Sequence, residues 1–185
     1  MSAGYVPYLQ VAANTARNVY AIIRPMILYH ASNCEVKVPM LVASNRLLDF
    51  GPGFYTTTNR EQAVRFAKSV VSKRGGDPFL NVYEFDADAA YAGLLALRFD
   101  APTEQWLDFV VANRSGTYVG ERYDLVAGPV ANDNVYTTIG LYMKGFMSRE
   151  ATIRELRVHK LYGQVVFCRP DAFRYLNYVK TEGLK

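Results

Sequence analysis

Helical and strand-like segments follow one another along this chain in no regular order, and this irregularity limits the possible folds more than any other feature. Apolar residues recur with a helical period in segments that begin near residues 58, 103, 133 and 148. Strand-like apolar runs occupy residues 26–30, 81–85, 125–127 and 163–168. A regular alternation of strand and helix would favour a parallel sheet. The irregular order therefore predicts an α+β domain.

Capping signals indicate where several of these helices begin and end. The segment Thr58 to Glu61 forms a capping-box pattern, and Gly75 can end the helix that follows it. Thr103 and Ser148 are typical residues for the start of a helix. Pro170 suits the first turn of a last helix, whose apolar side would hold Phe173, Leu176 and Val179.

The length of the chain suits one globular domain with a buried core. It has 185 residues, of which 50% are hydrophobic, and it shows neither a repeat nor a low-complexity linker. Residues 1–25 carry apolar positions at helical spacing up to Pro25, and Met26 opens the first strand-like run. We therefore expect an N-terminal helical extension over 1–25 and the domain itself over 26–185.

Charge and cysteine content narrow the functional classes. The net charge of +4 comes without a block of like charges, so its simplest role is solubility. Cys34 and Cys168 suit neither a zinc site nor a disulfide-rich module, which favours a reducing compartment. There is no apolar run of about 20 residues and no signal-peptide pattern. We expect a cytoplasmic protein, or one delivered into a target cell, without a membrane partner.

Three short segments, far apart in the sequence, carry residues that suit a nucleotide cleft. They are Leu28-Tyr29-His30-Ala31-Ser32, Phe50-Gly51-Pro52-Gly53-Phe54-Tyr55-Thr56-Thr57 and Gly163-Gln164-Val165-Val166-Phe167. Taken alone, His30 is more often a core histidine, and two glycines around a proline more often form a tight turn. Their joint occurrence favours a functional site.

The order of these segments resembles the His-Tyr-Glu signature of ADP-ribosyltransferases of the diphtheria-toxin and poly(ADP-ribose) polymerase type. His30, Tyr55 and Gln164 occupy the three signature positions, and Phe66 falls where that family carries a second aromatic residue. From about Met26 onward the chain looks closest to a prokaryotic ADP-ribosyltransferase-like family catalogued as a domain of unknown function. The marks of that resemblance are Leu28-Tyr29-His30, Asp49-Phe50-Gly51, Gly53-Phe54-Tyr55-Thr56-Thr57, Trp106-Leu107-Asp108-Phe109-Val110-Val111-Ala112-Asn113-Arg114, Tyr123-Asp124 and Gly128-Pro129-Val130-Ala131-Asn132-Asp133.

The resemblance implies split antiparallel β-sheets with surrounding helices, and a cleft that binds NAD as substrate without a metal. Breaking the nicotinamide–ribose bond leaves an oxocarbenium-like sugar, so the rings of Tyr55 and Phe66 would sandwich the nicotinamide and fix its tilt. His30 would orient a ribose hydroxyl rather than transfer a proton. The implied catalytic residues are His30, Tyr55 and Gln164. The implied NAD-binding residues are His30, Ala31, Ser32, Gly53, Tyr55 and Phe66.

Gln164 departs from the family pattern, in which a Glu stands at this position. A neutral amide stabilises the oxocarbenium less than a carboxylate does, but it can still hold the ribose 2′-hydroxyl. We therefore expect transfer of single ADP-ribose units and no chain elongation. Ala31 stands where the family has Gly, which is a smaller departure.

Several alternatives stay open on the sequence alone. Phe66 and Gln164 can each be explained as structural residues, and so can Asn113, Arg114, Asp124 and Asp133. The enzyme hypothesis predicts a protein or nucleic-acid acceptor and, through the resemblance, a role as toxin or effector with an antitoxin or immunity partner. A second hypothesis is a catalytically inactive module that binds NAD or ADP-ribose. A third is a plain nucleic-acid-binding domain, for which no recognised motif is present.

Overall fold

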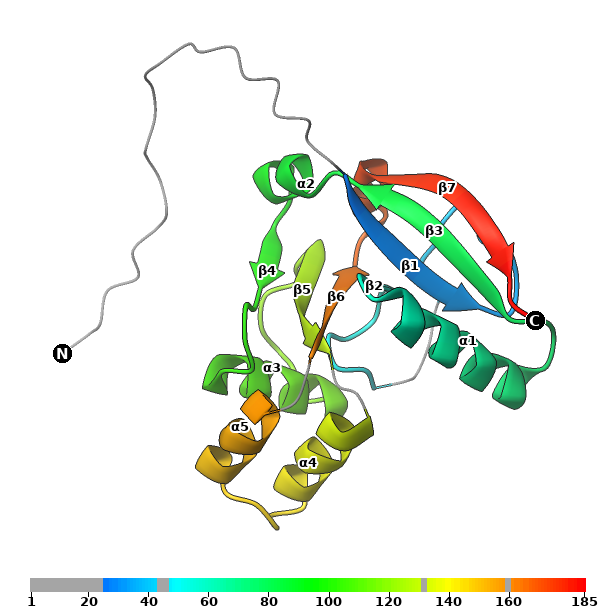
Figure 1. Cartoon of the computed structure of the whole chain (residues 1–185). Helices are drawn as coiled ribbons and strands as arrows, with labels where there is room; N and C mark the ends of the chain where they lie inside the picture. The colour runs from blue at the N-terminus through cyan, green and yellow to red at the C-terminus, as the bar shows by residue number, and fades with distance from the viewer. Residues whose placement is uncertain (1–24, 43–46, 131–132, 159–160) are drawn as a thin grey trace.

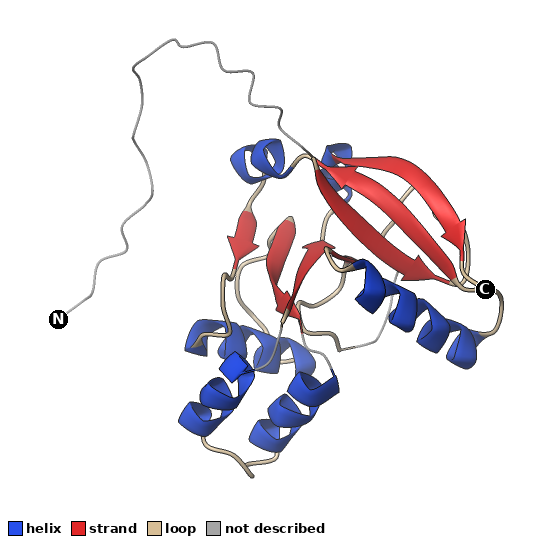
Figure 2. Ribbon diagram, in the orientation of Figure 1, coloured by secondary structure: helices blue, strands red, loops and turns tan. Residues whose placement is uncertain are grey.

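The computed structural model describes residues 25–42, 47–130, 133–158 and 161–185. It confirms the α+β class: one seven-stranded mixed sheet carries helices on both of its faces (Figures 1 and 2). The strands are β1 (Met26–Ser32), β2 (Phe54–Thr57), β3 (Phe79–Phe85), β4 (Ala96–Arg98), β5 (Leu125–Val130), β6 (Tyr162–Phe167) and β7 (Leu176–Gly183). The helices are α1 (Arg60–Arg74), α2 (Ala87–Gly93), α3 (Glu104–Arg114), α4 (Asp133–Met143), α5 (Arg149–Val158) and the 3₁₀ helix η1 (Pro170–Tyr175).

The sheet has the strand order β4-β5-β6-β2-β1-β3-β7 and consists of two well-paired parts. β1 pairs with β3 along its whole length, and β2 pairs with β6 along its whole length. The two parts meet between β1 and β2 at the single registered pair Tyr29 and Thr57, where they diverge in Figure 2. The expectation of split antiparallel sheets is wrong for β4 and β5, which pair in parallel.

Two cores lie on opposite faces of the sheet. On one face, Phe54, Val165 and Phe167 pack with α2, η1 and the start of β7. On the other face, α3, α4 and α5 cover Val126 and Val166. α1 covers the β1 and β3 part of this second face, where its buried alanines contact a third cluster: Ala63, Leu80 and Val82, with Tyr29 and Ala31 packed against it. The alternation of side chains along each strand produces this division.

The helix start near residue 58 differs by one residue from the sequence-based prediction. The N-cap of α1 is Asn59, whose side chain accepts a hydrogen bond from the Gln62 amide, and not Thr58. Asn caps a helix as well as Thr does, and the two residues are adjacent. The predicted starts at Thr103 and Ser148 are confirmed, because their side chains accept bonds from the amides of Trp106 and Ala151.

The prediction of a C-terminal helix after Pro170 is wrong. The helical segment is only the 3₁₀ helix η1, and the chain then forms the edge strand β7, paired with β3. Leu176 enters the first core whereas Val179 is 45% exposed, so the apolar residues do not share a helical side. The sequence analysis also missed α2 and β4. The expected helical extension over 1–25 lies outside the described residues, apart from Pro25.

Candidate functional site

The structure brings together the three strands that carry the predicted site residues. His30 lies on β1, Tyr55 on β2 and Gln164 on β6, and β2 is the strand between the other two. The register pairs Tyr55 with Val166 and Thr57 with Gln164. The side chains of directly opposed residues point to the same face, so Tyr55 and Gln164 share the face that α1 and α3 to α5 cover.

Gln164 carries an orphan hydrogen-bond acceptor. Among the described residues, its Oε1 is the one buried side-chain polar atom that has no hydrogen-bond partner. Its neighbours in the sheet are Thr57 on β2 and Gly128 on β5. The Thr57 hydroxyl instead donates to Oε1 of Gln62 on α1, at 2.8 Å. A buried acceptor without a donor is costly in a folded protein, and a hydroxyl or amide that donated to this atom would remove the cost.

The hydroxyl of Tyr55 is fixed by two hydrogen bonds to the turn before β2. This hydroxyl donates to the Gly51 carbonyl at 2.6 Å and accepts from the Phe50 amide at 3.2 Å. Burial is the largest cause of a pKa well above the ordinary value for tyrosine, and the nearby Asp49 carboxylate acts in the same direction. The hydroxyl therefore stays protonated and holds the turn before β2 against the Tyr55 ring.

His30 lies at the junction between the two parts of the sheet, but its ring belongs to the opposite face from Tyr55. The ring stacks on Phe54 with centroids 4.1 Å apart, and Nδ1 lies 2.8 Å from the Tyr55 carbonyl oxygen. A carbonyl only accepts, so Nδ1 carries the proton. Burial lowers the pKa of His30 and outweighs the opposing effect of this hydrogen bond, so the ring is neutral near pH 7 and Nε2 is an acceptor.

The glycines of the turn serve packing within the chain. A Cβ on Gly53 would lie 2.5 Å from Cγ1 of Val166 and 2.9 Å from the Phe167 carbonyl oxygen, so glycine is required for the approach of β2 to β6. Of the two glycines, only Gly51 has a positive φ, at 76°. Ser32, at the end of β1, accepts a hydrogen bond from the Cys34 amide.

Phe66 is not a core residue. It lies on α1 and is 53% exposed, whereas Ala63 and Ala67 are the buried positions of this helix. Within the described parts of the chain, no ring contact joins Phe66 to Tyr55. Its exposure removes the packing explanation of this residue and leaves the ring accessible to a ligand. The second face therefore presents Tyr55 and Gln164 on the sheet and Phe66 on the adjacent helix.

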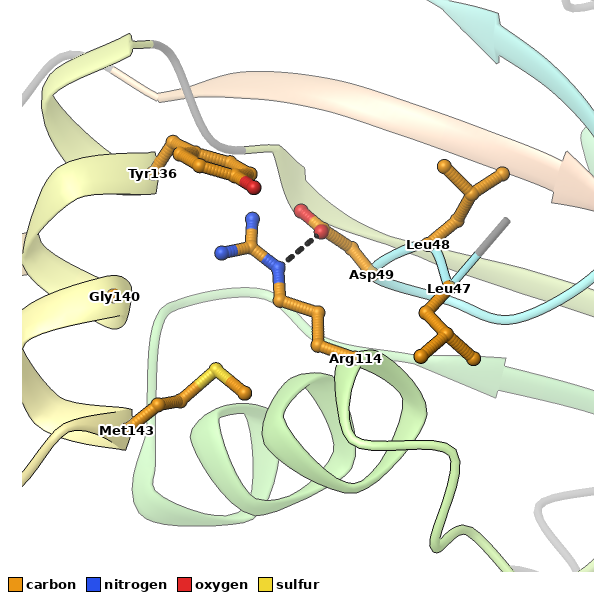
Figure 3. Close-up of a pocket in the computed structure, with 7 residues that line it drawn as sticks. All are labelled: Leu47, Leu48, Asp49, Arg114, Tyr136, Gly140 and Met143. Carbon is orange, nitrogen blue, oxygen red and sulfur yellow. Dashed lines mark hydrogen bonds and ion pairs between the residues drawn. The ribbon is translucent and has the colours of Figure 1, made fainter. Parts of the chain in front are cut away.

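A pocket of about 490 Å³ lies next to the turn that holds Tyr55. Figure 3 shows Arg114 of α3 beside Asp49, with the terminal guanidinium nitrogens directed toward the ring of Tyr136. The Arg114 Nε lies 2.7 Å from the Asp49 Oδ1, with side-chain exposures of 9% and 14%, and the guanidinium carbon lies 4.4 Å from the Tyr136 ring centroid. The sequence analysis quoted Asp49 only as a mark of the resemblance and named Arg114 as a residue that a structural ion pair can explain, but it did not pair the two.

Two of the other secondary candidates, Asn113 and Asp124, make structural contacts. Asn113 is buried, and its amide donates to the Phe109 carbonyl. Asp124 accepts from the Leu95 amide and lies 3.5 Å from Arg169. The side chain of Asp133 is outside the described part of the structure. These contacts confirm a structural role for Asn113 and Asp124.

No group of His, Cys, Asp and Glu able to hold a metal ion occurs among the described residues. Both cysteines are free, and burial raises the pKa of Cys168 to about 12, so its thiol is unreactive near neutral pH. In the part of the chain that the structure describes, no helix has the length and apolar character needed to cross a membrane.

Comparison with known proteins gives a family without a described activity. The family model described as "Protein of unknown function (DUF3990)" matches residues 26–178. No curated protein and no solved structure matches the chain. The matched range contains β1, β2, α1 and β6, and with them every predicted site residue. Because this match spans most of the chain, the protein belongs to the DUF3990 family.

Proposed function

We propose that the protein is an NAD-dependent mono-ADP-ribosyltransferase whose reaction centre lies around Gln164. The observation that carries the proposal is the orphan Oε1 of Gln164, a buried acceptor that has no hydrogen-bond partner among the described residues. It stands at the position that the sequence resemblance assigns to the ribose of NAD. A ribose 2′-hydroxyl donating to Oε1 would remove the cost of leaving this atom unpaired.

The surrounding side chains suit the two ends of the scissile bond. The accessible Phe66 and the anchored Tyr55 supply two rings for the nicotinamide plane. The neutral His30 is joined to the Tyr55 carbonyl and so holds the strand that presents this ring. The His30 ring lies on the face of the sheet opposite Gln164, so the direct contact of His30 with the ribose that the resemblance implies stays a prediction. The backbone of Ala31, the Ser32 hydroxyl and the turn at Gly53 stay predicted NAD contacts.

The reaction separates charge within a bound dinucleotide. The bond between C1′ of the ribose and the nicotinamide nitrogen breaks, and its electron pair leaves with the neutral nicotinamide. A nucleophile of the acceptor forms the new bond to C1′ and releases its proton to water. Gln164 contributes by orienting the 2′-hydroxyl, and its amide dipole stabilises the cationic sugar less than a carboxylate would. We therefore expect slow transfer of single ADP-ribose units.

The test is incubation of the purified protein with labelled NAD and a cell lysate, following nicotinamide release and label on macromolecules. Gln164→Ala, Tyr55→Ala and His30→Ala should each lose both signals. Gln105→Ala, at an exposed position of α3, is the matched control for the amide and should keep both. Equal signals from Gln164→Ala and the control would remove the proposal, and a polymeric product would contradict the single-unit transfer.

A second function rests on the same residue. An amide in place of a carboxylate at 164 suits a module that binds NAD or ADP-ribose without cleaving it. Calorimetric binding of NAD that is lost in Gln164→Ala, together with no nicotinamide release, would establish this alternative. It is consistent with the orphan acceptor, because binding alone satisfies that atom.

A further inference from the structure

The excess of basic over acidic residues in this chain lies on one helix, α1. α1 contains the basic residues Arg60, Arg65, Lys68, Lys73 and Arg74 and a single acidic residue, Glu61. The whole chain has 21 Lys and Arg residues, 17 Asp and Glu residues and a net charge of +4. The excess on α1 equals this net charge, so basic and acidic residues are equal in number over the rest of the chain. The net positive charge, which looks scattered in the sequence, is therefore carried by α1.

These basic side chains are free to meet a partner. Arg65, Lys68 and Lys73, which we call the basic face of α1, are all exposed, and so is Arg74 at the end of the helix. In the described structure they make no ion pair, whereas Arg60 pairs with Glu182. Ser69 and Ser72 lie between them, and these short side chains leave room for another backbone to approach the helix.

The basic face adjoins the candidate site. α1 follows β2 directly and packs on β1, and Thr57 of β2 bonds to Gln62 in its first turn. Phe66 is exposed beside Arg65. A long polyanion that runs along the basic face toward the first turn of α1 would therefore approach β2, whose Thr57 pairs with Gln164.

The spacing of the charges matches a phosphate backbone. Arg65 and Lys73 are eight residues apart, which is about 12 Å along an α-helix. One strand of a nucleic acid places a phosphate about every 3.4 Å along the duplex axis, so roughly four phosphates span the same length. We infer that α1 is a nucleic-acid-binding surface, which recognises the phosphate backbone through its basic face. Nucleic acid is then the acceptor class, and this last step rests on the proposed function.

The helix dipole and a membrane surface each account for only part of the charge pattern. Lys73 and Arg74 suit the negative end of the helix dipole, but Arg65 and Lys68 lie in earlier turns, beyond the reach of that effect. A helix that lies on an anionic membrane inserts an apolar stripe, and the apolar side of α1 is buried against the sheet at Ala63 and Ala67. The exposed side offers cations and a single ring, which suits a polyanion in water.

The experiment measures binding without NAD, by fluorescence anisotropy of short labelled single-stranded DNA, single-stranded RNA and duplex DNA. The test variant is the triple change Arg65→Gln, Lys68→Gln and Lys73→Gln. The matched control makes the same changes of charge at the exposed residues Arg122, Lys144 and Lys185. Vesicles containing phosphatidylserine and a poly-glutamate chain test the membrane and acidic-protein alternatives.

The salt dependence gives the expected size of the effect. Three phosphate contacts contribute a slope of about −2.7 in log K against log salt for duplex DNA and about −2.1 for single strands. Between about 50 and about 200 mM salt, the affinity of the wild-type protein should therefore fall about 40-fold more than that of the triple variant for duplex, or about 20-fold more for single strands. The control variant should keep the wild-type slope.

Several results would overturn the inference. They are no oligonucleotide binding at about 50 mM salt, equal slopes for the triple and control variants, or binding to vesicles or poly-glutamate but not to oligonucleotides. Circular dichroism checks that the triple variant is folded, and nicotinamide release is measured separately. Release of nicotinamide without oligonucleotide binding would reject the basic face and keep the proposed activity. Oligonucleotide binding without nicotinamide release would keep the basic face as a nucleic-acid-binding surface and reject the proposed activity.

Discussion

Replacing Gln164 with methionine should make the ligand-free protein more stable while it abolishes the function. Methionine has nearly the shape of glutamine but lacks the carbonyl oxygen that is buried without a donor in this fold. Most substitutions of a buried polar residue lower the free energy of unfolding. Removing an acceptor that has no partner is expected to raise it, because the cost of burying that acceptor disappears. The direction of the change is therefore diagnostic.

The magnitude follows from the cost of the orphan atom. A buried acceptor without a partner costs about 1–3 kcal/mol. Glutamine and methionine lose similar rotamer freedom on burial, so this entropic contribution nearly cancels. The Gln164 side chain is only half-buried as a whole, which places the expected gain at the lower end, about 1–2 kcal/mol. In a chain of this size, that gain raises Tm by roughly 2–8 °C.

Trp106 provides the measurement. It is the only tryptophan, lies on α3 and is fully buried in the core. Its Nε1 donates to the Pro129 carbonyl, so its fluorescence follows loss of the tertiary structure. Urea unfolding should give a higher midpoint for Gln164→Met at an unchanged m value. Gln105→Met, at an exposed position, should change the free energy of unfolding by less than about 0.5 kcal/mol.

NAD should reverse the order of stability. A ligand at 100 times its Kd stabilises the protein that binds it by about 2.7 kcal/mol. The wild-type protein should gain this amount and the Gln164→Met variant should gain much less. A variant that is destabilised without NAD, or that gains as much from NAD as the wild type does, would refute the argument. The first result would mean that Oε1 has a partner, and the second that NAD binds elsewhere.

Three further changes test the contacts around the site, each by urea unfolding. Removing Arg114 (Arg114→Met) should cost about 3–5 kcal/mol by leaving Asp49 buried and unpaired, and Asp49→Leu in the same chain should recover most of the loss; an additive double variant would contradict the pairing. Because the pKa of His30 is below 6.5 in the fold, the free energy of unfolding should fall as the pH drops below about 6.5, by up to about 1.4 kcal/mol per pH unit; His30→Asn should flatten this dependence, and an unchanged slope would contradict it. Gly53→Ala should cost about 1–3 kcal/mol through its contacts with β6. Its cost should be smaller in a Val166→Ala background than in the wild type, because one of the two close atoms is then absent; an equal cost would place the clash elsewhere.

The sequence was sufficient for the elements with strong local signals. Periodicity and caps located α1, α3 and α5 to within a residue or two, because Asn59, Thr103 and Ser148 satisfy amides of their own first turns. These interactions are local and can be read from spacing alone. The prediction of a helix after Pro170 was wrong because the conformation of this segment depends on distant residues. Its apolar residues fit a helical period, but pairing with β3 decides its conformation, and tertiary pairing overrides a weak local preference.

The candidate site was predictable as a set of strands but not as an arrangement of side chains. The sequence resemblance selected three strands that the structure places side by side. It did not indicate that the His30 ring would stack on Phe54, on the face opposite Tyr55, because the face depends on the register at the junction of β1 and β2. The ion pair between Asp49 and Arg114 was also hidden, since nothing in the sequence connects residues 65 positions apart.

Two independent considerations meet at residue 164. The first is the sequence order, which assigns this residue to the chemistry through resemblance alone. The second is physical: natural folds satisfy nearly all buried polar atoms, and they break this rule mainly at functional sites. In the described structure, the one buried side-chain atom that breaks it belongs to this same residue. A packing role for Gln164 would be served better by an apolar residue, so the retained amide is best explained by a partner that the chain itself does not supply.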